Sequence, residues 1–144
     1  MSEKGLRQAA LTLVESDSIV EGALSAARRL KINVCVAVCN REGRLIAFKC
    51  MDGTYAEAGR LAVGKAVVSA ATGQPSGEVS GIVEHPVAGT AFAEGMPAIR
   101  IRGGLPILRD EVVVGGCGVG GGPSNESDEE CARAGIAVFH TRRG

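Results

Sequence analysis

The chain has 144 residues, of which 45% are hydrophobic and only 3% aromatic, with no tryptophan. Lysine and arginine together number 16, as do aspartate and glutamate, so the formal net charge is zero. A nucleic-acid-binding protein would need a basic surface and aromatic stacking groups, which this composition lacks. Length and composition instead predict one domain, residues 1–144, with a core of small aliphatic side chains.

The sequence contains no apolar run long enough for a signal peptide or a membrane-spanning helix. We therefore expect a cytoplasmic protein that has no membrane partner. The five cysteines form no CxxC pair, and a zinc site would need more ligands at metal spacing. Cys35 and Cys39 would share one face of a strand, and we interpret them as buried reduced thiols.

The first half of the chain predicts a helix followed by a β-hairpin. Thr12 and Glu15 have the spacing of a capping box, and the apolar residues after them recur at helical spacing, which predicts a helix over residues 13–30. Residues 32–38 and 44–50 are predicted as antiparallel strands, because only a short polar turn separates them.

A stripe of small side chains marks the next predicted helix, residues 55–71. Its members recur every four residues: Ala58, Ala62, Ala66 and Ala70. Such a stripe lets another backbone approach closely, in core packing, in a subunit contact or in a ligand contact. Because the chain is poor in large apolar residues, burial across a two-fold interface would supply additional core, and we expect a homo-oligomer.

The second half of the chain predicts three strands between two helices. The strands are expected at residues 97–101, 105–108 and 112–119, and the proline of the second one suits an edge of the sheet. A short helix over residues 76–84 precedes them, and a longer helix follows Pro123. Hairpin-linked strands with segregated helices predict an α+β domain, built on a single antiparallel sheet of about five strands flanked by helices.

Three glycines of the last predicted strand match the GxGxxG pattern of dinucleotide-binding proteins: Gly116, Gly118 and Gly121. Too few residues follow them to complete a βαβ unit, so we do not favour dinucleotide binding. The glycines are better explained by a close approach of this strand to a helix or to another subunit. Free backbone N–H groups near Ser124 could also receive a carboxylate or another anion.

His85, Glu84 and Lys65 are the candidate catalytic residues. His85 lies beside Glu84 in an irregular segment and could ligate a haem iron or transfer protons, although a structural role is the simpler interpretation. Lys65 lies among small residues of a helix, where a lysine usually extends to solvent but can also pair with a ligand carboxylate. The residues alone therefore indicate a globular domain with a small-ligand site at most.

Several short segments between about residues 12 and 139 have a characteristic order and spacing. They comprise the hairpin 36–47, Met51-Asp52-Gly53, Lys65-Ala66, Gly103-Gly104-Leu105-Pro106-Ile107, the glycine-rich run 113–121, Pro123-Ser124 and the acidic Asp128-Glu129-Glu130. Together these segments resemble the GlcG/HbpS-like haem-binding family, which includes the C-terminal domain of PduO-type adenosyltransferases.

The resemblance implies a central sheet of the profilin-like or PAS-like kind, symmetric oligomers, ligand sites near subunit interfaces and, in some members, haem binding. No histidine lies in the first helix of this chain, so His85 is the expected iron ligand. The expected function is to bind haem or a related planar anionic ligand. The alternative is an isomerase, lyase or hydrolase of a small carboxylic acid, in which Lys65 and Arg102 hold the carboxylate while His85 or Glu84 moves protons.

Three features of the sequence are modest attractors of an anion. They are Lys65, Arg102 at the Gly103-Gly104 turn, and a helix start at Ser124. Together they could hold a carboxylate, including a haem propionate, if the fold brings them close to one another. Otherwise they are three unrelated surface features.

Overall fold

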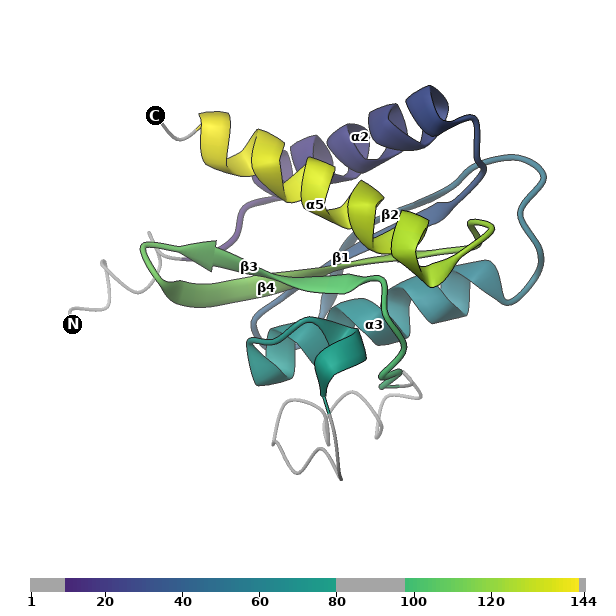
Figure 1. The fold of residues 1–144 in the computed structure, drawn as a ribbon. Helices are drawn as coiled ribbons and strands as arrows, with labels where there is room; N and C mark the ends of the chain where they lie inside the picture. Colours follow the sequence, from purple (N-terminus) through teal and green to yellow (C-terminus); the bar gives the residue numbers. More distant parts are fainter. Residues whose placement is uncertain (1–9, 80–97, 143–144) are drawn as a thin grey trace.

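The fold is an antiparallel sheet with helices on both faces (Figure 1). The computed structural model describes residues 10–79 and 98–142. The elements in chain order are α2 (Leu13–Leu30), β1 (Cys35–Asn40), β2 (Leu45–Cys50), α3 (Ala58–Thr72), the 3-10 helix η1 (Ser76–Glu78), β3 (Gly104–Arg109), β4 (Val112–Gly120) and α5 (Asn125–Arg142). The α+β class predicted from the sequence is confirmed.

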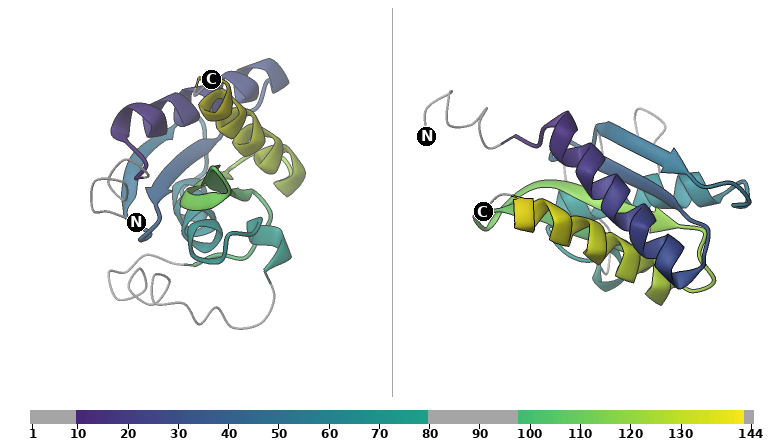
Figure 2. Two further views of the ribbon diagram at one scale, coloured as in Figure 1. Left: turned by 90° about the vertical axis from the view of Figure 1, so that its left-hand side faces the viewer. Right: turned by 90° about the horizontal axis from the view of Figure 1, so that it is seen from above.

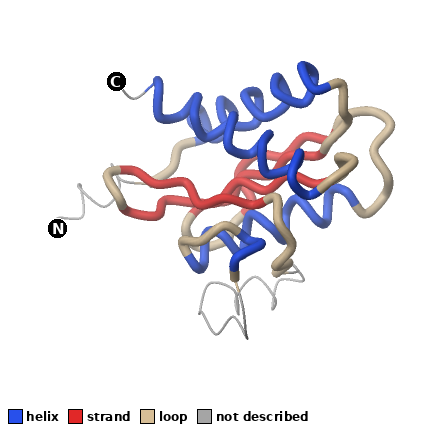
Figure 3. The backbone as a smooth tube through the Cα atoms, in the orientation of Figure 1, coloured by secondary structure: helices blue, strands red, loops and turns tan. Residues whose placement is uncertain are grey.

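The sheet has four strands in the order β2-β1-β4-β3, and every neighbouring pair is antiparallel. The helix α3 covers one face, whereas α2 and α5 lie side by side on the other (Figure 2). Figure 3 shows the same three layers, with the strands between the helices. One cluster of buried apolar side chains lies on each face of the sheet, beneath the helices that cover it.

The helix α2 begins and ends where local chemistry dictates. The side-chain oxygen of Thr12 accepts a hydrogen bond from the backbone N–H of Glu15, and the Glu15 carboxylate accepts one from the backbone N–H of Thr12. This capping box satisfies two N–H groups that the helix itself leaves unpaired. At the other end Lys31 has the left-handed conformation (φ 58°) that commonly ends a helix. The predicted bounds, residues 13–30, are confirmed.

The alanine stripe of α3 packs directly on the glycines of β4. A Cβ atom on Gly116 or Gly118 would collide with the carbonyl oxygens of Ala66 and Ala62 respectively. The helix backbone thus lies closer to the strand than any side chain on the strand would allow. Core packing within the chain, one of the three predicted roles of the stripe, is therefore confirmed, and so is the close approach predicted for the glycines.

The predicted strand over residues 97–101 is wrong for its described part, residues 98–101, which is irregular. The backbone N–H of Ile99 donates to the carbonyl oxygen of Gly64 in α3 at 3.1 Å, so this segment bonds to a helix rather than to a strand. The sheet consequently has four strands among the described residues, not about five. Its edge strand β3 contains Pro106, as predicted.

The hairpin of β1 and β2 contains one extra residue. Cys39 pairs with Leu45, but the residue before it in β1, Val38, pairs with Ala47. Ile46 is therefore the extra residue of a β-bulge. Beyond the bulge the ladder is regular and brings Cys35 opposite Cys50.

The structure joins Cys35 and Cys50 in a disulfide bond. The prediction of a reduced thiol is therefore wrong for Cys35, because the hairpin register gives it a cysteine partner. The prediction is confirmed for Cys39, which is a buried free cysteine, like Cys117 and Cys131.

Two further expectations concern the middle of the chain and the membrane. Of the helix predicted over residues 76–84, the structure describes only residues 76–79, where the short 3-10 helix η1 ends at Glu78; the residues from 80 onward lie outside the described ranges.

No helix in the described parts of the chain is long and apolar enough to cross a membrane.

Candidate functional site

Lys65 belongs to α3, and its side chain extends through the interior of the protein toward the first turns of α5. Its side chain is 1% exposed, and its Nζ donates a hydrogen bond of 2.9 Å to the carbonyl oxygen of Val119. The same nitrogen lies 3.3 Å from Oδ2 of Asp128, with which it forms a buried ion pair. The expectation that Lys65 extends to solvent is wrong, because a carboxylate 63 residues later in the chain meets it inside the protein.

Asp128 is held from both sides. Its Oδ1 accepts a hydrogen bond of 2.9 Å from the backbone N–H of Gly122, while its Oδ2 faces Lys65. Burial raises the pKa of Asp128 and lowers the pKa of Lys65, and the attraction between the two charges opposes both shifts. The pair ties α3 to α5 and to the turn before α5.

The Gly103-Gly104 turn covers this pair and has no space for side chains. Gly103 has a φ of 137°, and a Cβ on it would lie 2.7 Å from both Nζ of Lys65 and the carbonyl oxygen of Val119. A Cβ on Gly104 would lie 2.5 Å from the Lys65 carbonyl oxygen. The backbone N–H of Gly104 donates to Oγ of Ser76 at 2.8 Å. Close packing on Lys65 therefore explains why both positions are glycine.

Arg102 is the exposed cation of the cluster. Its side chain is 46% exposed, and its guanidinium group forms ion pairs of 3.3 Å with Glu129 and 3.6 Å with Glu126. Glu129 is nearly buried and also accepts a hydrogen bond of 2.9 Å from Arg133. Arg102 is thus anchored on the first turns of α5 and remains accessible to solvent.

Ser124 immediately precedes α5 and caps it. Its Oγ accepts a hydrogen bond of 3.0 Å from the backbone N–H of Ser127. Lys65, Arg102 and Ser124 therefore converge on the first turns of α5, as an anion site would require. However, Lys65 and Arg102 both pair with acidic residues of α5 and the Ser124 hydroxyl caps the helix, so the exposed Arg102 is the member best placed to meet a ligand.

His85 and Glu84, the expected iron ligand and proton carrier, lie outside the described residues. The other histidine, His140, donates from Nε2 to the carbonyl oxygen of Leu108 at 3.1 Å. No group of three or more His, Cys, Asp or Glu side chains that could hold a metal ion occurs within residues 10–79 and 98–142.

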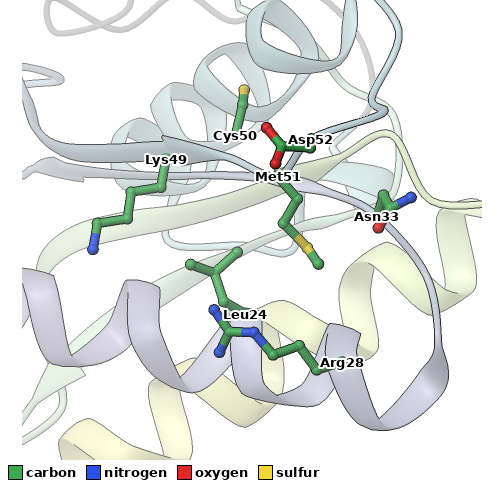
Figure 4. Close-up of a pocket in the computed structure, with 7 residues that line it drawn as sticks. All are labelled: Leu24, Arg28, Asn33, Lys49, Cys50, Met51 and Asp52. Carbon is green, nitrogen blue, oxygen red and sulfur yellow. The ribbon is translucent and has the colours of Figure 1, made fainter.

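A groove of about 440 Å³ between α2 and the end of β2 was not predicted from the sequence. Figure 4 shows Arg28 of α2, Lys49 of β2 and Met51, which follows β2, reaching into it. Lys49 forms a 2.6 Å ion pair with Glu21, whereas Arg28 has no ion pair with any acid in the described ranges. The sequence gives no sign of this groove, because the groove exists only once β2 lies across α2.

Comparison with known proteins identifies the family. Residues 11–137 match the model of a family described as "Haem degrading protein HbpS-like". No curated protein sequence matches the chain.

Similar solved structures include HbpS (29% identity; 90% of this chain and 89% of that one; TM-score 0.75) and a double mutant of HbpS from Streptomyces reticuli (30% identity; 90% and 86%; TM-score 0.75). Another is a PduOC:heme complex (25% identity; 90% and 94%; TM-score 0.75). The protein ORFY of Klebsiella pneumoniae (23% identity; 90% and 90%; TM-score 0.76) shares the fold. The chain therefore belongs to the HbpS-like family, as its sequence segments predict.

Proposed function

We propose that this protein binds haem, or a related planar anionic ligand, near a subunit interface of a homo-oligomer. The observation that carries the proposal is the likeness to the PduOC:heme complex over 90% of the chain, together with a family model whose description names haem. The proposed iron ligand is His85, because an imidazole is a strong ligand of haem iron.

Two exposed cations support an anionic ligand. Arg102 lies at the Gly103-Gly104 turn, and its long ion pairs leave guanidinium donors for a carboxylate. Arg28 faces the groove of Figure 4 and forms no direct ion pair with an acidic residue of the described ranges, although Glu21 lies within reach of its charge. In this proposal Lys65 does not touch the ligand. It pairs with Asp128 beneath Gly103 and so fixes the turn that presents Arg102.

Large apolar side chains on the surface are available for self-association. The most exposed of them are Val14 (75%), Leu13 (65%) and Tyr55 (53%), and further examples are Val112, Ile101, Phe48, Leu30 and Leu45. Burying such side chains between copies of the chain would remove apolar area from water. Sedimentation should therefore reveal a species larger than 14.7 kDa at micromolar concentration, and a purely monomeric protein would refute this part of the proposal.

Haemin titration tests the binding proposal. We expect a saturable, shifted Soret band, and we expect His85→Ala to abolish the shift while circular dichroism stays native. His140→Ala is the matched control and should leave the band unchanged. If no shifted band forms with the wild-type protein, haem binding is refuted. An unchanged band in His85→Ala would exclude only this histidine as the ligand.

Two arginine variants locate the anionic group. Either Arg102→Gln or Arg28→Gln should weaken haemin binding about tenfold, the effect of losing one charged hydrogen bond. The dimethyl ester of haemin has no free carboxylate. The wild type and the variant that weakens haemin binding should therefore bind this ester with equal affinity. If neither variant changes haemin affinity, both arginines are excluded as carboxylate ligands.

A further inference from the structure

Cys35 and Cys50 face each other at a position fixed by the sheet. The neighbouring pair is Val34 and Met51, where the Met51 N–H donates to the Val34 carbonyl oxygen at 3.0 Å. Hydrogen-bonded and non-hydrogen-bonded pairs alternate along an antiparallel ladder, so Cys35 and Cys50 occupy a non-hydrogen-bonded pair, where side chains are closest. The strand pairing therefore keeps the two sulfur atoms adjacent even when the bond between them is open.

The two cysteines differ sharply in accessibility. Cys35 is completely buried in the central strand β1, whereas Cys50 ends the edge strand β2 and is exposed. Figure 4 shows the Cys50 side chain pointing away from α2 and from the groove that Lys49 and Met51 enter. Cys50 is thus the half of the disulfide that lies toward solvent, whereas Cys35 is closed to a thiol reagent.

The remaining cysteines are poor participants in thiol exchange. Cys39, Cys117 and Cys131 are buried. Burial raises the pKa of Cys39 to about 12 and that of Cys131 to about 11, and it also raises the pKa of Cys117. Because the thiolate is the nucleophile in disulfide exchange, these three cysteines cannot compete for the disulfide.

A hydroxyl group lies next to the buried sulfur atom. Oγ1 of Thr54 is 3.5 Å from Sγ of Cys35, and it donates to the carbonyl oxygen of Met51 at 3.0 Å. When Cys35 leaves as a thiolate, this hydroxyl can rotate to donate to its sulfur, and the protonated thiol can later donate to the hydroxyl oxygen. The leaving group therefore has a polar partner in an otherwise apolar interior.

We propose that the Cys35–Cys50 disulfide is a redox-active site that a dithiol reductant opens by attack at Cys50. One thiolate of the reductant bonds to Sγ of Cys50, the S–S bond breaks, and Cys35 leaves as a thiolate that takes up a proton. The second thiol of the reductant loses its proton and displaces Cys50, which is protonated in turn. Two electrons and two protons pass to the protein, the reductant becomes a disulfide, and a disulfide oxidant reverses the reaction. No haem is required for this chemistry.

Opening the bond also affects the groove between α2 and β2. Cys50 belongs to the strand end that forms one wall of this groove, together with Lys49, Met51 and Asp52. Once the bond is open, only ladder hydrogen bonds and side-chain packing hold this wall to β1. The redox state should consequently alter how firmly this wall is held, while the strand pairing keeps it in place.

Differential alkylation of the native protein tests the proposal. Native protein is incubated with dithiothreitol and alkylated, then unfolded, reduced and alkylated with an isotopically heavy reagent, and each cysteine is read by mass spectrometry. We expect the light label on Cys50 alone, in proportion to dithiothreitol. A light label on Cys50 without reductant would show that no disulfide forms. A disulfide that resists dithiothreitol until the protein unfolds would equally overturn the proposal.

A threonine pair separates direct attack from local unfolding. Thr54→Val should slow the dithiothreitol reaction about fivefold, the effect of losing one hydrogen bond. Thr72→Val is the matched control, since its Oγ1 likewise donates to a backbone carbonyl, that of Val68 at 2.8 Å. This control should leave the rate unchanged. If both variants react at the wild-type rate, Thr54 has no part in the mechanism. If both react faster than the wild type by the same factor, the disulfide opens by unfolding and not by direct attack.

Discussion

Lys65 and Asp128 neutralise each other inside the protein, 3.3 Å apart and almost completely shielded from water. Removing one partner of such a pair is costly, because it leaves the other charge buried without compensation. Asp128→Asn should therefore lower the free energy of unfolding by about 3–5 kcal/mol in urea titrations. Glu130→Gln, on the exposed surface of the same helix, is the control and should change it by less than about 0.5 kcal/mol.

A double variant tests whether the pair acts through charge. Lys65→Met combined with Asp128→Asn removes both buried charges, so the double variant should be more stable than Asp128→Asn alone. If its loss equals the sum of the two single losses, the residues are not coupled and the interpretation of the pair is wrong.

Glu15 should make the protein sensitive to acid. Hydrogen bonds from Arg109, at 2.7 and 2.9 Å, are the main reason that the pKa of this carboxyl falls to about 2. Its ordinary value is 4.5, so between pH 4.5 and 2 the folded state binds fewer protons than the unfolded state, and stability falls as the pH falls. Above pH 4.5 the contribution is complete. Glu15→Gln should flatten this part of the pH–stability curve, whereas Glu130→Gln should retain it.

The contact of β4 with α3 should not tolerate a methyl group. Gly118→Ala would place a Cβ against the carbonyl oxygen of Ala62 in α3, and neither backbone can move without disturbing the sheet. We expect a loss of at least about 3 kcal/mol in the free energy of unfolding, or an insoluble protein. Val112→Ala, at the exposed start of the same strand, should change it by less than about 1 kcal/mol. A soluble Gly118→Ala variant of wild-type stability would contradict the packing.

The disulfide should stabilise the oxidised protein. Cys35 and Cys50 are 15 residues apart, and closing a loop of that length is worth about 3 kcal/mol. Cys50→Ser should therefore be less stable than the oxidised wild type by about that amount in denaturant titrations. With excess dithiothreitol the two proteins should become nearly equal. A difference that persists under reducing conditions would assign the loss to packing instead.

Features fixed by nearby residues could be predicted from the sequence. The capping box of Thr12 and Glu15 set the start of α2, and the repeating small residues of α3 and β4 indicated a close backbone contact. The burial of Lys65 could not be predicted, because its partner lies 63 residues away and no local pattern connects them. The predicted strand at residues 97–101 was wrong because β-propensity cannot show that Ile99 bonds to a helix.

The candidate site was predicted only in part. The sequence suggested that Lys65, Arg102 and Ser124 could converge, and they do lie around the start of α5. What it could not show is that the acidic residues of this helix would occupy both cations. The groove beside Arg28 was missed for a similar reason, since its two walls come from elements whose crossing depends on tertiary packing.

The extra residue Ile46 has a genetic consequence. Because the bulge takes up one residue of β2, deleting the Ile46 codon would give an unbroken ladder in which Val38 still faces Ala47 and Cys35 still faces Cys50. A regular ladder that kept Ile46 would instead place Lys49 opposite Cys35 and Cys50 opposite Val34, on the other face of the sheet. The strand can therefore lose this one residue in a single evolutionary step and keep the register of its disulfide.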